Sequence, residues 1–519
     1  MHRSTWDRSS GARLVVLAAV IALVVGVWAS AATASAASAS VSGPVTGGAG
    51  AILPPNLNGF DLGQVGYEQS EFFLQGTATA YTSSAALTSD GKWSVTPVPA
   101  TDPTFPPAPY KTRLVVYRPI DPKRFNGTVI VEWLNVSGLV DANPDWTQTH
   151  NELIRDGFAW VGVSAQAQGV NQLKCTALSL TCPALGDPGR YGTLSHPGDN
   201  YSYDIFSQGG QAVRDQSATI LGGLTPKKLI AAGESQSAGR MVTYIDAVHP
   251  LVHVYDGFLV HSRGAAGAAL LAAPPALPPL PAVVPAPTPT FIRTDLGVPV
   301  FVFQTESDVA GAFSARQPDT NIFRQWEAAG TSHFDTYGLL IGPSDTGNGQ
   351  GAVANLAAMQ NPTNVPGPGG LCTQPINTGG AHWLLNSAVY WLNQWVTRGT
   401  PPPIGQPLQI ASTSPFAYAM DANGNTLGGV RTPQVDAPIA TLGGIGNTAA
   451  NAAAISQFCR LFGSTVPFTP TQLAALYKNH IQFTAAWGLD IFKLVVTGYL
   501  RPVDGVELLN AAASSHIGG

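Results

Sequence analysis

Short apolar runs rich in β-branched residues recur from about Thr112, and helix-compatible stretches separate them. Several runs are continuously apolar, which is typical of strands buried on both faces of a sheet. Strands that alternate with helices favour an α/β fold with a mostly parallel, doubly wound sheet. The predicted strands are Arg113–Tyr117, Thr128–Trp133, Ala159–Ser164, Lys228–Ala232, Gly257–His261, Val300–Gln304 and Phe323–Ala328. The predicted helices are Trp146–Asp156, Gln208–Leu221, Ala238–Val248, Trp383–Thr397 and Thr471–His480.

Two stretches interrupt this alternation, at about 262–297 and 338–380. The first contains a Pro-rich segment, 272–290, which predicts an extended connector or part of a lid. Both insertions fall where a doubly wound sheet carries its ligand-binding loops. Residues 60–110 predict β-rich structure before the sheet, and a C-terminal extension begins at about 404. We expect a single domain over 37–519.

The N-terminus has the pattern of a secretory signal peptide over residues 1–36. Three arginines precede an uncharged apolar run, Leu14–Val27, which is followed by several small-residue cleavage sites. The run is short for a membrane-spanning helix, so we expect a secreted or cell-envelope-associated protein with no stable span after cleavage. Removing three Arg and one Asp lowers the net charge from −5 to −7. Such a charge does not favour nucleic acid as a partner.

The chain has four cysteines. An even number in an exported protein predicts two disulfides. Of the three connectivities we prefer Cys175–Cys182, which closes a short loop, with Cys372–Cys459. No Cys-x2-Cys pair is present, so a cysteine metal site is the weaker interpretation.

The predicted strand Lys228–Ala232 leads into Gly-Glu-Ser-Gln-Ser-Ala-Gly at 233–239 and then into a helix. A sharp strand-to-helix turn of this kind exposes a nucleophilic serine and needs small residues two positions before and after it. Ser235 and Ser237 both fit in part. We prefer Ser235, because Ser237 would extend the apolar strand through Glu234, whereas Ser235 puts Gly233 in the strained position and lets Gln236 open the helix. The positive N-terminus of that helix would favour an oxyanion.

An acid and a base follow in the order typical of an α/β-hydrolase triad. One predicted strand is followed by Glu306 and Asp308, and the next is followed by a Gly-containing turn and His333. The spacing leaves room for one helix and one strand, so the acid and base fall at adjacent strand ends. We predict Asp308 as the residue that orients the imidazole. Glu306 is the alternative acid.

The strongest competitor for the base is His382, which begins a helix. It lacks a strand-end acid at a suitable separation, so we predict that it touches the substrate or a neighbouring loop. His249 and His253 resemble a pair of metal ligands, but Pro250 interrupts the helix that would align them. We therefore expect no metal and no cofactor.

An oxyanion hole requires two backbone donors. Gln236, the residue after the nucleophile, is the first. The second should come from the loop after Thr128–Trp133, where we predict Asn135, with Leu134 or Val136 as alternatives.

At this level of detail the chain resembles secreted or periplasmic bacterial α/β-hydrolase domain proteins whose elbow reads Gly-x-Ser-Gln-Ser-Gly-Arg. The resemblance implies Ser235 as the nucleophile and names no substrate. Ala238 stands where the family more often has Gly, which makes the elbow tighter. The matching stretches, spread over most of 60–519, are GESQSAGR at 233–240, VEWLNVSG at 131–138, PVFVFQTESD at 299–308, WEAAGTSHFD at 326–335, HWLLNSAVYWLNQWVTRGTPPP at 382–403 and FCRLFGSTVPF at 458–468.

These patterns predict a serine hydrolase that cleaves carboxylic esters of small-molecule or lipid-like substrates through an acyl-enzyme. Amidases, thioesterases and lactonases use the same groups, so the bond is less constrained than the mechanism. The alternative is a catalytically silent binding or surface protein that keeps the fold, because a fold alone does not guarantee activity.

Overall fold

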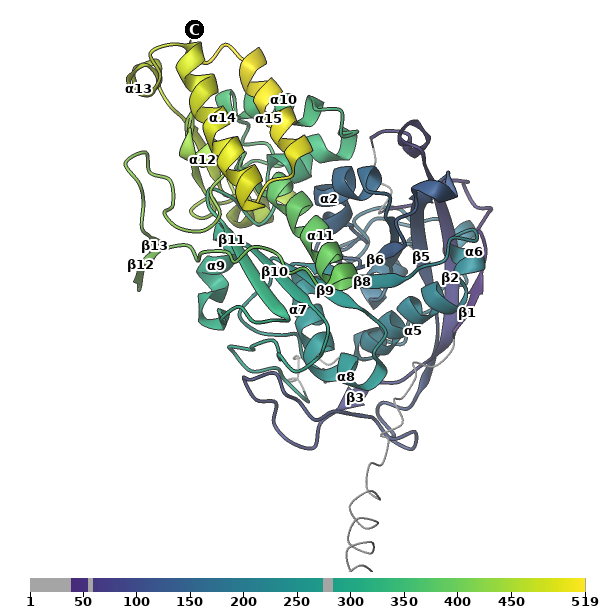
Figure 1. Cartoon of the computed structure of the whole chain (residues 1–519). Helices are drawn as coiled ribbons and strands as arrows, with labels where there is room; N and C mark the ends of the chain where they lie inside the picture. The colour runs from purple at the N-terminus through teal and green to yellow at the C-terminus, as the bar shows by residue number, and fades with distance from the viewer. Residues whose placement is uncertain (1–38, 55–58, 274–282, 519) are drawn as a thin grey trace, which may run out of the picture. The chain divides into compact units, whose positions relative to one another are not determined.

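A nine-stranded sheet forms the centre of the structure (Figure 1). This computed structural model describes residues 39–54, 59–273 and 283–518. The predicted signal peptide at 1–36 lies outside the described residues, as does the 274–282 part of the Pro-rich segment. The strands run, in spatial order, β1 (Ser40–Ser42), β2 (Tyr67–Ala78), β5 (Ala108–Pro119), β7 (Ala159–Val163), β6 (Thr128–Trp133), β8 (Lys228–Glu234), β9 (Gly257–His261), β10 (Val300–Thr305) and β11 (Phe323–Ala328).

The sheet is mostly parallel, as the alternation of strands and helices predicts. Every neighbouring pair from β7 to β11 is parallel, whereas the pairs β1–β2, β2–β5 and β5–β7 are antiparallel. The sequence analysis placed residues 60–110 before the sheet. The structure corrects this, because β2 pairs with β5 along twelve residues and belongs to the sheet itself.

Helices cover both faces of the sheet, and successive strand residues alternate between the two cores they create. Val131 of β6 packs in the core that includes Met241 of α7. The preceding Ile130 packs in the core that includes Leu384 of α11. The α-helices are α2 (Pro144–Arg155), α3 (Ala167–Gln172), α4 (Pro188–Tyr191), α5 (Ser202–Asp215), α6 (Ser217–Ile220), α7 (Gln236–Thr243), α8 (His249–Val252), α9 (Glu306–Ala312), α10 (Gln350–Gln360), α11 (Ala381–Arg398), α12 (Pro433–Asp436), α13 (Pro470–Leu476), α14 (His480–Thr497) and α15 (Pro502–Ser514).

The insertion between β9 and β10 has no helix or strand within its described residues. Its start is fixed by Arg263, a buried residue whose guanidinium donates to the carbonyl oxygens of Gly264, Ala265 and Thr290. The second insertion, at 338–380, contains α10. Whether either insertion acts as a lid stays a prediction.

The C-terminal extension forms two small two-stranded sheets and the helices α12 to α15. Figure 1 shows α14 and α15 side by side near the C-terminus. The small strands outside the main sheet are β3 (Tyr81–Thr82) with β4 (Thr96–Pro97), β12 (Ile410–Thr413) with β13 (Phe416–Tyr418), and β14 (Ala440–Gly443) with β15 (Ser464–Pro467).

Two disulfides join the pairs of cysteines that the sequence analysis preferred. Cys175–Cys182 closes a loop after α3, and Cys372–Cys459 ties the second insertion to the C-terminal extension. Across the described ranges, no helix is both long enough and apolar enough to cross a membrane.

Candidate active site

The turn between β8 and α7 holds Ser235 in an unusual backbone conformation. Its φ is 59° and its ψ is −116°, which a residue with a side chain rarely adopts. A side-chain carbon added at Gly233 would lie 3.0 Å from the carbonyl oxygen of Ser237, so the turn favours a glycine there. One detail of the sequence analysis is corrected: β8 continues through Glu234, and the strain falls on Ser235 rather than on Gly233.

Ser237 occupies a different environment from Ser235. Its side chain is fully buried, and its hydroxyl donates to the carbonyl oxygen of Leu134 over 3.4 Å. Ser235 is only half-buried. Of the two serines, Ser235 is therefore the one whose hydroxyl faces the predicted base.

Ser235, His333 and Asp308 lie in one hydrogen-bonded series. The Ser235 Oγ atom lies 2.7 Å from His333 Nε2, and His333 Nδ1 lies 2.6 Å from Asp308 Oδ1. The three residues follow the parallel strands β8, β10 and β11, with β9 between the first two, and the carboxyl ends of these strands lie at one edge of the sheet. This is why residues separated by up to 98 positions converge.

Asp308 is fixed by the end of the strand that precedes it. Its second oxygen, Oδ2, accepts the backbone N–H of Thr305 at 2.8 Å and the Thr305 hydroxyl at 2.7 Å. Burial alone would raise the pKa of Asp308, but His333 and the Thr305 donors hold that pKa below its ordinary value. Asp308 is therefore held as a carboxylate against the imidazole.

Glu306, the alternative acid, points elsewhere. Its carboxylate accepts the backbone N–H groups of Gly330 at 2.5 Å and Gly444 at 2.9 Å. Burial raises the pKa of Glu306 to about 7. Its two oxygens thus connect two segments, which are the loop that contains Gly330 and His333 and the C-terminal extension that contains Gly444.

Further contacts fix the same loop. The backbone N–H of His333 donates to Ser307 Oγ at 3.1 Å, and the Ser307 hydroxyl donates to the Gly444 carbonyl oxygen. The side-chain amide of Asn377 donates to the carbonyl oxygens of Gly330 and Gly443. His333 is therefore held in place by contacts with both the second insertion and the C-terminal extension.

The predicted oxyanion donors are met only in part. The backbone N–H of Gln236 begins α7 and has no acceptor among the described residues. The N–H of Asn135 donates to the Ala142 carbonyl oxygen, and that of Leu134 to the Val163 carbonyl oxygen, so neither is free. Val136, the remaining alternative, has no acceptor in the described part of the chain.

His382 is buried at 1% exposure, and its Nδ1 lies 2.7 Å from the carbonyl oxygen of Gln148. Its ring stacks on Tyr337 with the centroids 3.7 Å apart, and burial lowers its pKa to about 3. These contacts place the ring between α2 and Tyr337, and contact of His382 with a substrate stays a prediction.

Sequence reasoning missed Glu234, the residue immediately before Ser235. Its Oε1 atom lies 3.1 Å from His333 Nε2. The side-chain amide of Asn135 donates to Glu234 Oε2 at 3.2 Å and to the Glu234 carbonyl oxygen at 3.0 Å. Its position within the elbow was the available signal, but the sequence analysis used this glutamate only to choose between the two serines.

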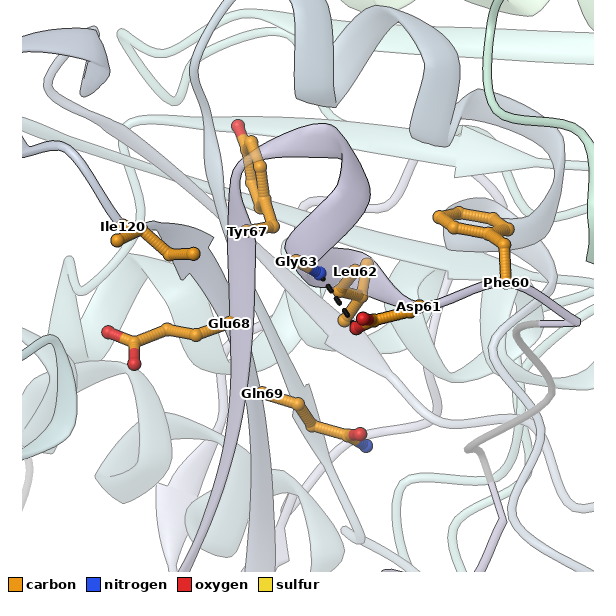
Figure 2. A pocket seen from close by; sticks show the side chains of 8 residues that line it. All are labelled: Phe60, Asp61, Leu62, Gly63, Tyr67, Glu68, Gln69 and Ile120. Atoms are coloured by element: carbon orange, nitrogen blue, oxygen red, sulfur yellow. Dashed lines mark hydrogen bonds between the residues drawn. The ribbon is translucent and has the colours of Figure 1, made fainter.

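A separate hollow, with a volume of about 470 Å³, lies around the start of β2 (Figure 2). None of its lining residues belongs to the Ser235 site, and the one bond drawn there runs from the Gly63 N–H to Asp61. The lining residues are Phe60, Asp61, Leu62, Gly63, Tyr67, Glu68, Gln69 and Ile120. Within the described ranges, no cluster of three or more His, Cys, Asp or Glu side chains could hold a metal ion.

Comparison with solved structures finds weak likenesses to hydrolases. A protein described as a dienelactone hydrolase from Klebsiella pneumoniae is 12% identical, with 47% of this chain and 77% of that chain covered and a TM-score of 0.23. A carboxylesterase from Lactobacillus plantarum is 11% identical, with 38% and 67% covered and a TM-score of 0.22. A fungal esterase from Rhizomucor miehei is 12% identical, with 45% and 66% covered and a TM-score of 0.20. Scores this low carry no argument about the substrate.

A comparison with curated proteins gave no match. The family described as "Alpha/beta hydrolase domain" matches residues 39–510, which is most of the chain. The mostly parallel sheet, with helices on both faces, is the architecture that this description requires. The chain therefore belongs to the alpha/beta hydrolase domain family.

Proposed function

We propose that this chain is a serine hydrolase that cleaves carboxylic esters through Ser235, His333 and Asp308. The observation that carries the proposal is the unbroken series of contacts from Ser235 Oγ to His333 and on to Asp308, at 2.7 and 2.6 Å. These separations are within the range of hydrogen bonds that transfer a proton.

The proposed reaction begins when His333 Nε2 takes the proton from Ser235 Oγ as that oxygen attacks the ester carbonyl carbon. The backbone N–H groups of Gln236 and Val136 are the proposed donors to the resulting oxyanion. His333 then gives its proton to the departing alcohol, which leaves an acyl group on Ser235. The same imidazole then takes a proton from a water molecule, whose oxygen attacks the acyl carbon. The bond from that carbon to Ser235 Oγ breaks, Oγ takes the proton back from His333, and the acid is released.

Asp308 supports both proton transfers. Its carboxylate accepts a hydrogen bond from the Nδ1–H group, which leaves the lone pair of His333 on Nε2 facing Ser235. It also stabilises the imidazolium that forms in each half of the reaction. Amide, thioester and lactone bonds could be cleaved by the same steps, and esters are the preferred proposal.

We also propose that the protein is exported. The apolar N-terminal run with small-residue cleavage sites supports this, as do the two disulfides, which persist in oxidising compartments. Mass spectrometry of the non-reduced mature protein should find no free thiol. Two or more free thiols in exported protein would contradict the two disulfides on which this support rests.

The test of the hydrolase uses the mature protein and a fluorophosphonate probe that labels activated serines. We expect labelling of the wild type and loss of both labelling and ester hydrolysis in Ser235→Ala. The matched control is Ser237→Ala, two residues away, which should keep substantial activity. An unlabelled wild type that hydrolyses no p-nitrophenyl ester of any acyl length would instead indicate a silent binding protein.

A further inference from the structure

The base of the proposed triad meets a carboxylate at each ring nitrogen. Asp308 lies at Nδ1, and Glu234 Oε1 lies 3.1 Å from Nε2, on the side of the ring that faces Ser235. Glu234 is 4% exposed, and Asn135 holds its second oxygen. The triad mechanism uses Asp308 and leaves the role of Glu234 open.

Charged and titratable groups from four elements face Glu234. They are His333 after β11, His261 on β9, Asp145 on α2 and Asp308 on α9. His261 is the register partner of Glu234 in the sheet, and its Nδ1 lies 2.9 Å from Asp145 Oδ1. That pair occupies His261 Nδ1, and the Glu234 carboxylate lies 3.1 Å from His333 Nε2.

An ionised carboxylate at this position distinguishes the two forms of the base. Neutral His333, with its proton on Nδ1, presents a lone pair at Nε2 and offers Glu234 no proton. Protonated His333 presents an N–H at Nε2, which can point to Glu234 Oε1 as well as to Ser235 Oγ. The contact is therefore favourable only with the imidazolium, the form present when the serine attacks.

We infer that Glu234 is a further catalytic residue, which accepts the Nε2 proton of protonated His333 as a hydrogen bond and so sets the pH at which the base becomes free. This inference rests on the proposed function, because it assigns His333 as the base. Glu234 is then a second anionic partner of the imidazolium, in addition to Asp308.

The electrostatics of the two groups agree with this assignment. Burial alone would lower the pKa of His333, but the charges of Glu234 and Asp308 outweigh burial and raise that pKa to about 9. Arg460 acts in the opposite direction. Burial raises the pKa of Glu234 to about 7, although His333 and His261 lower it. The base must be neutral to accept a proton, so activity should rise as the pH approaches about 9.

The test compares the pH dependence of kcat/KM for the wild type and Glu234→Gln between pH 5.5 and 10. The rise of kcat/KM with pH, here called the acidic limb, reports the pKa of His333. Removing the opposite charge at this distance should lower that pKa by about 1–3 pH units. The transition state loses the same stabilisation as the protonated resting enzyme. We therefore expect the two proteins to have similar kcat/KM at the lowest pH, where His333 is protonated in both. At high pH, where His333 is neutral in both, kcat/KM of Glu234→Gln should be lower by about 10- to 1,000-fold. A merely structural role would reduce kcat/KM by one factor at every pH.

Two further variants make the comparison specific. Glu234→Asp keeps the charge, so its pH profile should give a His333 pKa between those of the wild type and Glu234→Gln. Asp204→Asn removes another buried carboxylate, which accepts hydrogen bonds from Thr79 and Gln208. This variant should show the same pKa as the wild type in the pH dependence of kcat/KM.

A measurement without turnover separates this inference from the proposed function. The pKa of His333 is read from the ¹⁵N shifts of labelled histidine in the full-length mature protein, with His333→Gln to assign the signal. We expect a lower pKa in Glu234→Gln, whether or not any ester is cleaved. An unchanged His333 pKa in a folded Glu234→Gln protein would overturn the inference. A wild-type protein that the fluorophosphonate probe does not label would instead count against the proposed hydrolase.

Discussion

Asp308→Asn should abolish most of the activity through the direction of a single proton. Asp308 Oδ2 accepts the backbone N–H of Thr305, a donor that cannot rotate away. An asparagine must therefore turn its carbonyl oxygen to Thr305 and its NH2 group to His333 Nδ1. The ring would then carry its proton on Nε2, facing Ser235, and could not accept the serine proton.

The loss expected from a misdirected tautomer is about 10⁴-fold in kcat, or about 5 kcal/mol of transition-state stabilisation. Folding should be less affected, because the Thr305 contacts are kept. The matched variant is Glu306→Gln, which should retain at least about a tenth of the turnover, since Glu306 contacts the backbone of Gly330 and Gly444 and not the imidazole.

The assay is the hydrolysis of one short-chain p-nitrophenyl ester by the three purified proteins, with thermal unfolding recorded for each. If Asp308→Asn keeps more than about a tenth of the wild-type kcat, the tautomer argument is wrong. If Glu306→Gln loses more than Asp308→Asn while both variants are folded, the role of the acid passes to Glu306.

Two other predictions concern stability. The free energy of unfolding in urea should be about 1 kcal/mol higher for Ser235→Gly than for Ser235→Ala. Glycine relieves a backbone strain of about 1–3 kcal/mol at φ 59°, which its greater chain entropy in the unfolded state offsets by about 0.5–1 kcal/mol. An equal or lower midpoint for the glycine variant would show that the turn is not strained. Replacing the cysteines of Cys372–Cys459, which are 87 residues apart, should cost about 4.6 kcal/mol, against about 2.4 kcal/mol for Cys175–Cys182, which are 7 apart. Urea unfolding of the two double alanine variants measures the difference, and a larger loss for the short loop would contradict it.

The parallel centre of the sheet was predictable because its strands are buried on both faces. The bounds of β6, β9 and β11 agree with the sequence analysis, since each is a compact run that turn residues delimit. The antiparallel edge was harder to predict. In β2 the buried Glu71 accepts a bond from Arg190 119 residues later, and a charged residue in a strand pattern reads as exposed until its partner is known.

The candidate site divides in the same way. Ser235, Asp308 and His333 each follow a predicted strand, so their convergence follows from the topology of a parallel sheet. The direction of the Glu234 side chain and the engaged N–H of Asn135 depend on contacts between loops distant in sequence. No local pattern encodes those contacts. The same is true of Glu306, whose partner Gly444 lies 138 residues away.

The bond between Glu306 and Gly444 has a consequence for the timing of assembly. Ribosomes add about 5–20 residues per second, so Gly444 is synthesised several seconds after His333. Until then the chain contains the whole proposed triad but lacks Gly444, whose backbone N–H and carbonyl oxygen bind Glu306 and Ser307 at the start of α9. A protein cut after α11 would be in the same condition permanently. The smallest active fragment should therefore extend well past the last triad residue.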